Sequence, residues 1–423
     1  MPRLLVDLTP LRVSVDYRRL WIGMSLSAVG THLTTVAVGL QVYDITGSTF
    51  EVGLVGLFAL VPLVVLGLYG GAVGDAHDRR RVVLASSTGL WIVALAITAQ
   101  AFAGNTSVWL LYGCVALQNG MFAINSPSRS AIVPRLLPPH LLPAANALSS
   151  LSFSGALMLG PLLAGVLIGW KGYGPAYAVE ALLLLVALGA VFRLPPIPPE
   201  GEVRRAGLGS VVEGLRYLGT RPNVRMTFLV DLCAMVLSMP RVLFPAIGAV
   251  HLGGGATTVG ILLAGMAVGT ALAGLFSGPL GHVHRQGLAV LVSVLSWGSA
   301  VVCFGLVVAA SPVAPDGRTS WLLWPAAACM AWAGASDMVS SVFRNTILQD
   351  ATPDAMRGRL QGVFIVVVAG GPRLGDVVLG SVAEISTEWV AAVGGGVACI
   401  TGVVLLAWWQ RGFARYDSRS PVP

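Results

Sequence analysis

The sequence is poor in charge. Only 11% of its 423 residues are Asp, Glu, Lys or Arg, whereas 55% are hydrophobic, and the mean hydropathy is +0.80. Soluble domains carry roughly 25% charged residues, so this composition excludes an ordinary water-soluble protein. The apolar residues fall in runs of about 20, the length that an α-helix needs to cross a bilayer. The composition therefore predicts an all-α protein that crosses a membrane many times.

Lysine and cysteine are also scarce. Lys171 is the sole lysine and no Gly-x-x-x-x-Gly-Lys-Ser/Thr stretch occurs, which disfavours a pump driven by ATP. The five cysteines lie inside predicted spans, are odd in number and lack paired spacing, so neither a disulfide framework nor a metal site is expected. The opening segment, MPRLLVDLTPLRVSVDYRRL, lacks the apolar core and cleavage site of a signal peptide. We expect it to remain as a short cytoplasmic segment.

Basic residues lie in alternate connections between the apolar runs. Arg79, Arg80 and Arg81 follow the second run and arginines mark every other connection after it, while the intervening connections hold only Lys171 and Arg318. Under the positive-inside rule this pattern predicts twelve spans with both termini in the cytoplasm. The net charge of +7 is therefore expected to set topology and not to bind nucleic acid. The predicted spans are 17–44, 51–74, 82–103, 107–130, 144–170, 174–193, 223–250, 256–281, 287–310, 320–350, 359–384 and 388–411.

The two halves of the chain repeat each other. Arg129-Ser-Ala-Ile in the first half matches Arg344-Asn-Thr-Ile in the second, and Gly160-Pro161 matches Gly375-Asp376. The two matches have the same separation along the chain. A second, slightly shorter register matches residues 71–75 to 278–282. Because these landmarks keep their order on corresponding spans, duplication is indicated. Parallel six-helix repeats are typical of one class of secondary transporter.

The repeat predicts the domain organisation. We expect two pseudo-symmetric six-helix bundles, residues 1–193 and 223–411, followed by a cytoplasmic tail over residues 412–423. The linker, residues 194–222, begins with prolines and continues with apolar residues at helical spacing. It is expected to be a stiff segment followed by an amphipathic helix on the cytoplasmic surface.

The stretch GGAVGDAHDRRRVVL, residues 70–84, resembles the loop signature of the major facilitator superfamily between spans 2 and 3. Glycines let two helix ends approach closely, and an aspartate can pair with a helix end or an arginine to latch one conformation. The sequence departs from the signature at Ala76 and Asp78. An ordinary basic loop that sets topology is the alternative. The resemblance implies a conformational latch formed by Gly71, Gly74, Asp75, Arg79 and Arg80.

Two further stretches extend the resemblance. ALMLGPLLAG, residues 156–165, is similar to the Gly-Pro motif of proton-antiport exporters in the superfamily, with Gly160, Pro161 and Gly165 matched. Generic packing of small residues is the alternative. The loop TILQDATPDAMRGRLQG, residues 346–362, together with PRVLFPA in span 7, resembles the enterobactin-exporter branch, which is close to bacterial drug-efflux members. The resemblance implies export of a siderophore or a drug.

A proton-driven exporter needs an intramembrane group that exists charged or neutral, so a buried Asp, Glu or His is the expected carrier. His32 lies about 20 Å from the cytoplasmic end of span 1, near the bilayer middle. Thr31, Thr34, Thr35 and Gln41 make part of this span polar, as expected of a helix that lines a cavity. A neutral histidine bonded to a nearby hydroxyl is the alternative.

The second half places aspartates and arginines inside its spans. Arg344 follows Asp337 by two helical turns in span 10, and Arg373 precedes Asp376 by one turn in span 11, so each arginine can pair on its own helix. Our first hypothesis for coupling is that protonation of Asp376 frees Arg373 to bind an anionic substrate group. Asp231 in span 7 is a further candidate. A permanent structural ion pair is the alternative in each case.

Span 4 lacks the mid-membrane arginine that many exporters of the superfamily have. We therefore expect the proton-coupling group in span 1, 7, 10 or 11. Glu180 and Asp44 are expected at the water interface, near the outer ends of their spans. The candidates for proton coupling are Asp376, Arg373, Asp337, Asp231 and His32. The candidates for the substrate cavity are Thr31, Thr35, Gln41, Gln118, Asn119, Arg241 and Arg344.

These observations predict a secondary transporter and not an enzyme. It is expected to export an amphipathic small molecule, such as a siderophore or a drug, in exchange for protons by alternating access. We expect a monomer in the cytoplasmic membrane that needs no cofactor or metal and has the lipid bilayer and its small-molecule substrate as partners. A proton-coupled importer of a small metabolite with the same fold, and a non-transporting membrane scaffold, are the alternatives.

Overall fold

The computed structural model of the protein describes residues 7–198, 216–278, 280, 283–311, 319–350, 354–417 and 419. For residues 68–76, 349–350, 354–366 and 368–369 the description covers the helix backbone alone. Most of the predicted linker helix and much of the 346–362 loop therefore lie outside the described side chains. All regular elements in the described ranges are helices.

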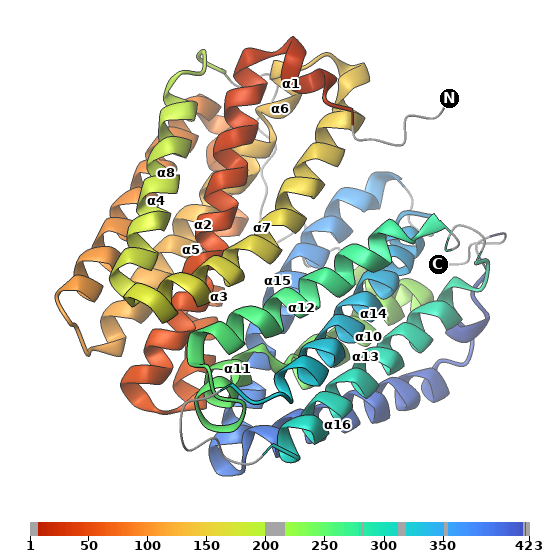
Figure 1. Ribbon diagram of the computed structural model, residues 1–423. Helices are drawn as coiled ribbons and strands as arrows, with labels where there is room; N and C mark the ends of the chain where they lie inside the picture. The colour runs from red at the N-terminus through yellow and green to blue at the C-terminus, as the bar shows by residue number, and fades with distance from the viewer. Residues whose placement is uncertain are drawn as a thin grey trace. The chain divides into compact units, whose positions relative to one another are not determined.

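The long helices agree with the predicted spans to within a few residues at most of their ends (Figure 1). In the first half they are α2 (Val15–Thr46), α3 (Thr49–Ala76), α4 (Arg79–Phe102), α5 (Val108–Ser130), α7 (Leu142–Lys171) and α8 (Tyr173–Phe192). In the second half they are α10 (Pro222–Leu237), α12 (Gly255–Leu275), α13 (Gln286–Ala309), α14 (Leu323–Asp350), α15 (Asp354–Ile385) and α16 (Glu388–Trp409). The short elements are α1 (Thr9–Val13), α6 (Val133–Leu136), η1 (Pro139–Leu141), η2 (Pro240–Leu243), α11 (Phe244–Ala246), η3 (Ile247–His251) and η5 (Phe413–Arg415).

Helix length and surface composition match a membrane protein. Among the described residues, 10 helical segments are long and apolar enough to cross a bilayer, and α14 and α15 are as long, at 28 and 32 residues. Large apolar side chains are exposed along these helices, and exposed tryptophans lie near their ends, as at Trp109, Trp170 and Trp321. Tryptophan favours the membrane–water interface. The predicted all-α membrane fold is confirmed.

Span 7 is broken, whereas the sequence predicted a continuous helix over 223–250. Helix α10 ends at Leu237, and the 3₁₀ turn η2, the short α11 and the π-helical turn η3 complete the crossing. Pro240 has no N–H to continue the helical ladder and disfavours helical geometry at Met239, which is extended. Trp297 of α13 donates a hydrogen bond of 2.8 Å to the Ser238 hydroxyl at the break. The break sets the position of Arg241, in η2.

The chain divides into two compact units. The first comprises Met1–Gln41 and Phe58–Gly207, and the second comprises Val42–Leu57 and Leu208–Pro423. The end of α2 and the start of α3 belong to the second unit because they pack on α15. The Ser48 hydroxyl donates to Glu384 at 2.8 Å, and a Cβ added at Gly53 would lie 2.6 Å from the Asp376 carbonyl oxygen.

Each unit has its own packed interior. In the first, α4 packs along α8 and α5, as Figure 1 shows. In the second, α14 packs between α12 and α13, and α10 packs along α15. Glycines make the closest helix contacts, since a Cβ at Gly269 of α12 would overlap the Ala331 carbonyl oxygen of α14. Close backbone approach at small residues is the usual means of packing membrane helices.

Candidate functional site

Two helices of the second unit place two carboxylates around one arginine. Arg344 of α14 forms an ion pair with Asp231 of α10, and both side chains are buried, with exposed fractions of 8% and 6%. Asp337 of α14 lies with Oδ1 3.4 Å from Nη2 of the same guanidinium, and its side chain is 39% exposed. We call these three residues the Arg344 triad. It carries one net negative charge when every member is ionised, and one proton makes it neutral.

The two carboxylates of the triad differ in the exposed fraction of their side chains. Asp231 is enclosed and its charge is balanced by Arg344, whereas Asp337 keeps more than a third of its surface exposed. Protonation of Asp337 therefore does not require opening the buried pair. The spacing of two helical turns predicted the contact of Arg344 with Asp337, and the structure adds Asp231 from a second helix.

Asp376 of α15 has a different partner from the one that its spacing suggested. Nε of Arg241 donates to both carboxylate oxygens, at 3.0 and 3.2 Å, and Nη2 donates to Oδ2 at 2.7 Å. The break in span 7 makes this possible, because η2 carries Arg241 against α15. Arg373 lies near enough to both groups to interact with them electrostatically. Two arginines therefore surround one aspartate, and this cluster carries one net positive charge.

Backbone contacts enclose Asp376. A Cβ at Gly56 of α3 would lie 3.2 Å from Oδ2 of this carboxylate, and a Cβ at Gly375 would overlap the Met235 carbonyl oxygen of α10. The helices on both sides thus touch α15 at this level, and only 10% of the Asp376 side chain is exposed. A bidentate, enclosed pair of this kind is typical of a structural contact between helices.

The first unit holds a carboxylate, Glu180, that is buried. Glu180 of α8 has no exposed surface and accepts hydrogen bonds from Thr34 of α2 and, at 2.7 Å, from Gln118 of α5. It does not lie at the water interface, as was predicted from its distance to the span end. Buried side-chain amides and hydroxyls require partners, so the polar residues inside spans 1 and 4 were the available signal.

The remaining candidates of the first unit have different neighbours. Gln41 is buried and exchanges hydrogen bonds of 3.2 and 3.1 Å with Gln100 of α4. His32 makes an edge-on ring contact of 5.9 Å with Phe153. Thr31 and Asn119 are partly buried and Thr35 is exposed, and each donates a hydrogen bond to the carbonyl one turn earlier in its own helix.

The Gly-Pro motif packs against the first span. A Cβ at Gly160 of α7 would lie 2.6 Å from the His32 Cβ and 3.0 Å from the Leu33 nitrogen of α2. Pro161 and Gly165 are buried in the same helix. Glycine at position 160 is therefore required for the contact of α7 with the α2 backbone.

The predicted latch is only partly described. For Gly71, Gly74 and Asp75 the structure describes the helix backbone alone. Nη1 of Arg79 donates to the Ala131 carbonyl at 3.3 Å, and Nη2 of Arg80 donates to the Phe192 carbonyl at 2.7 Å, so both arginines cap the ends of neighbouring helices.

Asp78, where the sequence departs from the superfamily signature, begins α4. Its Oδ1 accepts from the backbone N–H groups of Arg80 and Arg81 at 2.9 and 3.3 Å, which makes it the N-cap. The same oxygen accepts from the N–H of Ile197 at 3.3 Å. Asp78 therefore links the start of α4 to the segment that follows α8.

The comparisons with known proteins agree with this architecture. Residues 6–416 match the family described as transmembrane secretion effector. The enterobactin exporter EntS of Citrobacter koseri is 29% identical over 420 residues, covering 99% of this chain and 97% of that protein. EntS of Escherichia coli is 29% identical over 404 residues, covering 95% and 94%.

Solved transporters share the fold. A POT family transporter in complex with 5-aminolevulinic acid superposes with a TM-score of 0.74 at 10% identity, covering 95% of this chain and 97% of that one. The nucleoside transporter NupG superposes with a TM-score of 0.69 at 14% identity, covering 95% and 100%. These likenesses show the fold alone, whereas the family match covers nearly the whole chain. The chain therefore belongs to the transmembrane secretion effector family of the major facilitator superfamily, and it is a multi-pass membrane transporter and not an enzyme.

Proposed function

We propose that the protein exports an amphipathic small molecule in exchange for protons by alternating access. A siderophore or a drug is the expected substrate class, because the relatives named above are enterobactin exporters. We place the protein in the inner membrane of the cell, as a monomer with both termini in the cytoplasm. The arginines in alternate connections support this orientation.

The observation that carries the proposal is the Arg344 triad. Arg344 serves two carboxylates, one buried and one that is 39% exposed. When Asp337 takes up a proton, the charge of the triad changes from minus one to zero while the Asp231 pair stays in place. A charge change of this size inside a membrane span alters the relative stability of two conformations of the helix bundle.

The cluster of Arg241, Arg373 and Asp376 carries net positive charge, which favours a substrate with an anionic group. Arg241 and Arg373 together exceed the charge of Asp376 by one, and 34% of the Arg241 side chain is exposed. Since Asp376 is held by two-point hydrogen bonds, the geometry favours Asp337 over Asp376 as the coupling group. Asp376, Arg241 and Arg373 then serve to hold α15 to span 7 and to attract a carboxylate or catecholate.

Transport by everted membrane vesicles tests the proposal. Vesicles from cells that produce the full-length protein are given an acidic interior, and uptake of enterobactin is measured with and without an uncoupler. The proposal predicts uptake that the uncoupler abolishes. Uptake that needs an alkaline interior would identify a proton-coupled importer instead. Uptake that is independent of the proton gradient would contradict proton coupling.

An Asp337→Asn variant locates the coupling group. We expect it to lose gradient-driven uptake while it retains exchange of labelled for unlabelled enterobactin, a reaction that needs no net proton movement. Retained exchange also shows that the variant is inserted and folded. Normal gradient-driven uptake by Asp337→Asn would exclude this residue, and Asp376→Asn tests the first hypothesis in the same assay.

A further inference from the structure

The internal repeat identifies a counterpart of Arg344 in the first unit. Helices α5 and α14 correspond in the repeat, and they begin at Val108 and Leu323. Arg129 and Arg344 lie equally far from these starting points. The two arginines therefore occupy equivalent turns of equivalent helices.

The partners of the two arginines are not equivalent. Helices α2 and α10 begin at Val15 and Pro222, and Met24 lies as far into α2 as Asp231 lies into α10. The counterpart of Asp231 is therefore Met24. Met24 and Arg129 line one cavity, just as Asp231 and Arg344 touch in the second unit.

The second carboxylate is also replaced. Phe122 lies as far into α5 as Asp337 lies into α14, so it is the counterpart of Asp337. Both carboxylates of the Arg344 triad thus have apolar counterparts in the first unit.

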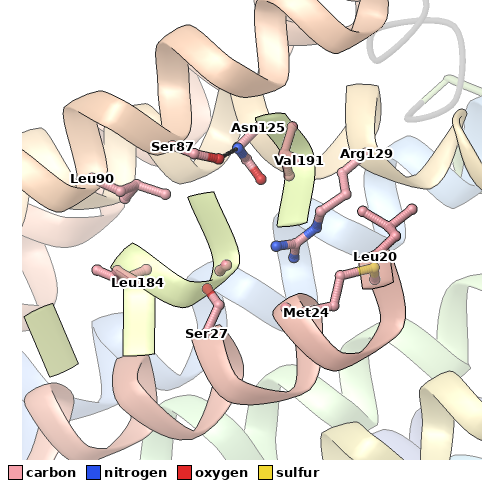
Figure 2. A pocket seen from close by; sticks show the side chains of 11 residues that line it. Leu20, Met24, Ser27, Ser87, Leu90, Asn125, Arg129, Leu184 and Val191 are labelled. Atoms are coloured by element: carbon pink, nitrogen blue, oxygen red, sulfur yellow. Dashed lines mark hydrogen bonds between the residues drawn. The ribbon is translucent and has the colours of Figure 1, made fainter. Parts of the chain in front are cut away.

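Arg129 keeps its charge in a small cavity. Figure 2 shows its guanidinium pointing into the space between α2, α5 and α8. The volume is about 10 Å³, close to the size of one water molecule. Among the described residues Arg129 forms no ion pair. The lining residues are Leu20, Gly23, Met24, Ser27, Ser87, Leu90, Asn125, Arg129, Leu184, Ala187 and Val191.

The polar groups of the cavity complement an anion. Ser27 and Ser87 supply hydroxyls, and the Ser87 oxygen already accepts from Nδ2 of Asn125 at 2.9 Å, which leaves its proton available for another acceptor. Oδ1 of Asn125 is buried without a hydrogen-bond partner. This oxygen is an acceptor and is not a ligand of the anion, for which the donors are Arg129, Ser27 and Ser87. The Met24 side chain is flexible enough to admit an ion slightly larger than water.

We propose that this cavity binds a small inorganic anion such as chloride, which takes the place of the carboxylates that neutralise Arg344. Arg129 is partly buried, and a charge removed from water is costly unless it is paired. Arg129 lies in the last turn of α5, where the helix dipole contributes only about half a negative charge. The site is separate from the Arg344 triad and does not depend on the proposed transport reaction.

Anion-dependent stability of the purified full-length protein tests the site. Unfolding in detergent is followed by tryptophan fluorescence in sodium chloride, sodium bromide or sodium gluconate at constant ionic strength. We expect chloride and bromide, but not gluconate, to raise Tm saturably, by about 1–4 °C. An equal Tm in chloride and gluconate would overturn the proposal and leave water as the occupant.

Three variants connect the effect to the cavity. Met24→Asp restores the carboxylate found in the second unit, so it is expected to abolish the chloride effect and to raise Tm in gluconate. Met24→Leu, the matched control, is expected to keep the chloride effect. Arg129→Gln is expected to lose it. A chloride effect of unchanged size in Arg129→Gln would refute the site even if Met24→Asp fails to fold.

Discussion

Replacing Asp231 by asparagine tests whether the buried Asp231–Arg344 ion pair of the triad stabilises the protein. The change leaves the Arg344 charge buried without its enclosed partner, and breaking a buried ion pair costs about 3–5 kcal/mol. Solvent screens this pair little, because the two side chains are 8% and 6% exposed. Asp337 is 39% exposed and 3.4 Å from Arg344, and exposed pairs contribute about 0–1 kcal/mol. Asp231→Asn is therefore expected to destabilise the protein several times more than Asp337→Asn.

Unfolding of the purified protein in mixed micelles of increasing SDS content measures both losses. The double variant Asp231→Leu/Arg344→Met is the control, since removing both charges also removes the cost of burying them. It is expected to be more stable than Asp231→Leu alone, and the cycle completed with Arg344→Met is expected to give a coupling energy of about 2–3 kcal/mol between the two sites. Equal losses for the two asparagine variants, or additive effects of the two positions, would refute the assignment of Asp231 as the structural partner.

Three further predictions concern other contacts. Gly160→Ala is expected to destabilise by about 1–3 kcal/mol because its Cβ meets the α2 backbone, whereas Gly155→Ala, with no atom within 4 Å, is expected to be neutral or stabilising; similar Tm values for the two variants would contradict the close packing. Asp78→Ala is expected to cost about 0.5–2 kcal/mol through loss of the N-cap, and Asp78→Asn should retain most of that stability in the same thermal assay. Arg241→Lys cannot reproduce the two-point bond to Asp376, so it is expected to lower Tm although the charge is kept; an unchanged Tm would show that charge alone suffices.

The helices were predictable because their signals are local. Apolar runs of span length, Pro and Gly at their ends and arginines in alternate connections fix where each crossing begins and ends. The break in span 7 was missed because the residues around Pro240 stay apolar, so hydropathy alone gave one continuous segment. Pro240 was the available signal for the break, because a proline disfavours helical geometry at the residue before it, here Met239.

The site was predictable in its residue types and less so in its partners. Spacing on one helix identified the contact of Arg344 with Asp337 but assigned Asp376 to Arg373, because no local rule reports that a broken helix brings Arg241 to α15. Glu180 was misplaced for a related reason. Its depth was inferred from distance along its own span, whereas its burial depends on Thr34 and Gln118 of two other helices.

Proton release on substrate binding is the direct measure of coupling through Asp337. Enterobactin is added to the purified protein in weakly buffered detergent that contains a pH-sensitive dye, and binding is measured in parallel by tryptophan quenching. Proton-coupled export through Asp337 predicts that the wild type releases protons in proportion to the ligand bound, and that Asp337→Asn binds the ligand without releasing protons. Binding by the wild type without proton release would exclude proton antiport, and equal release by Asp337→Asn would exclude Asp337 as the coupling group.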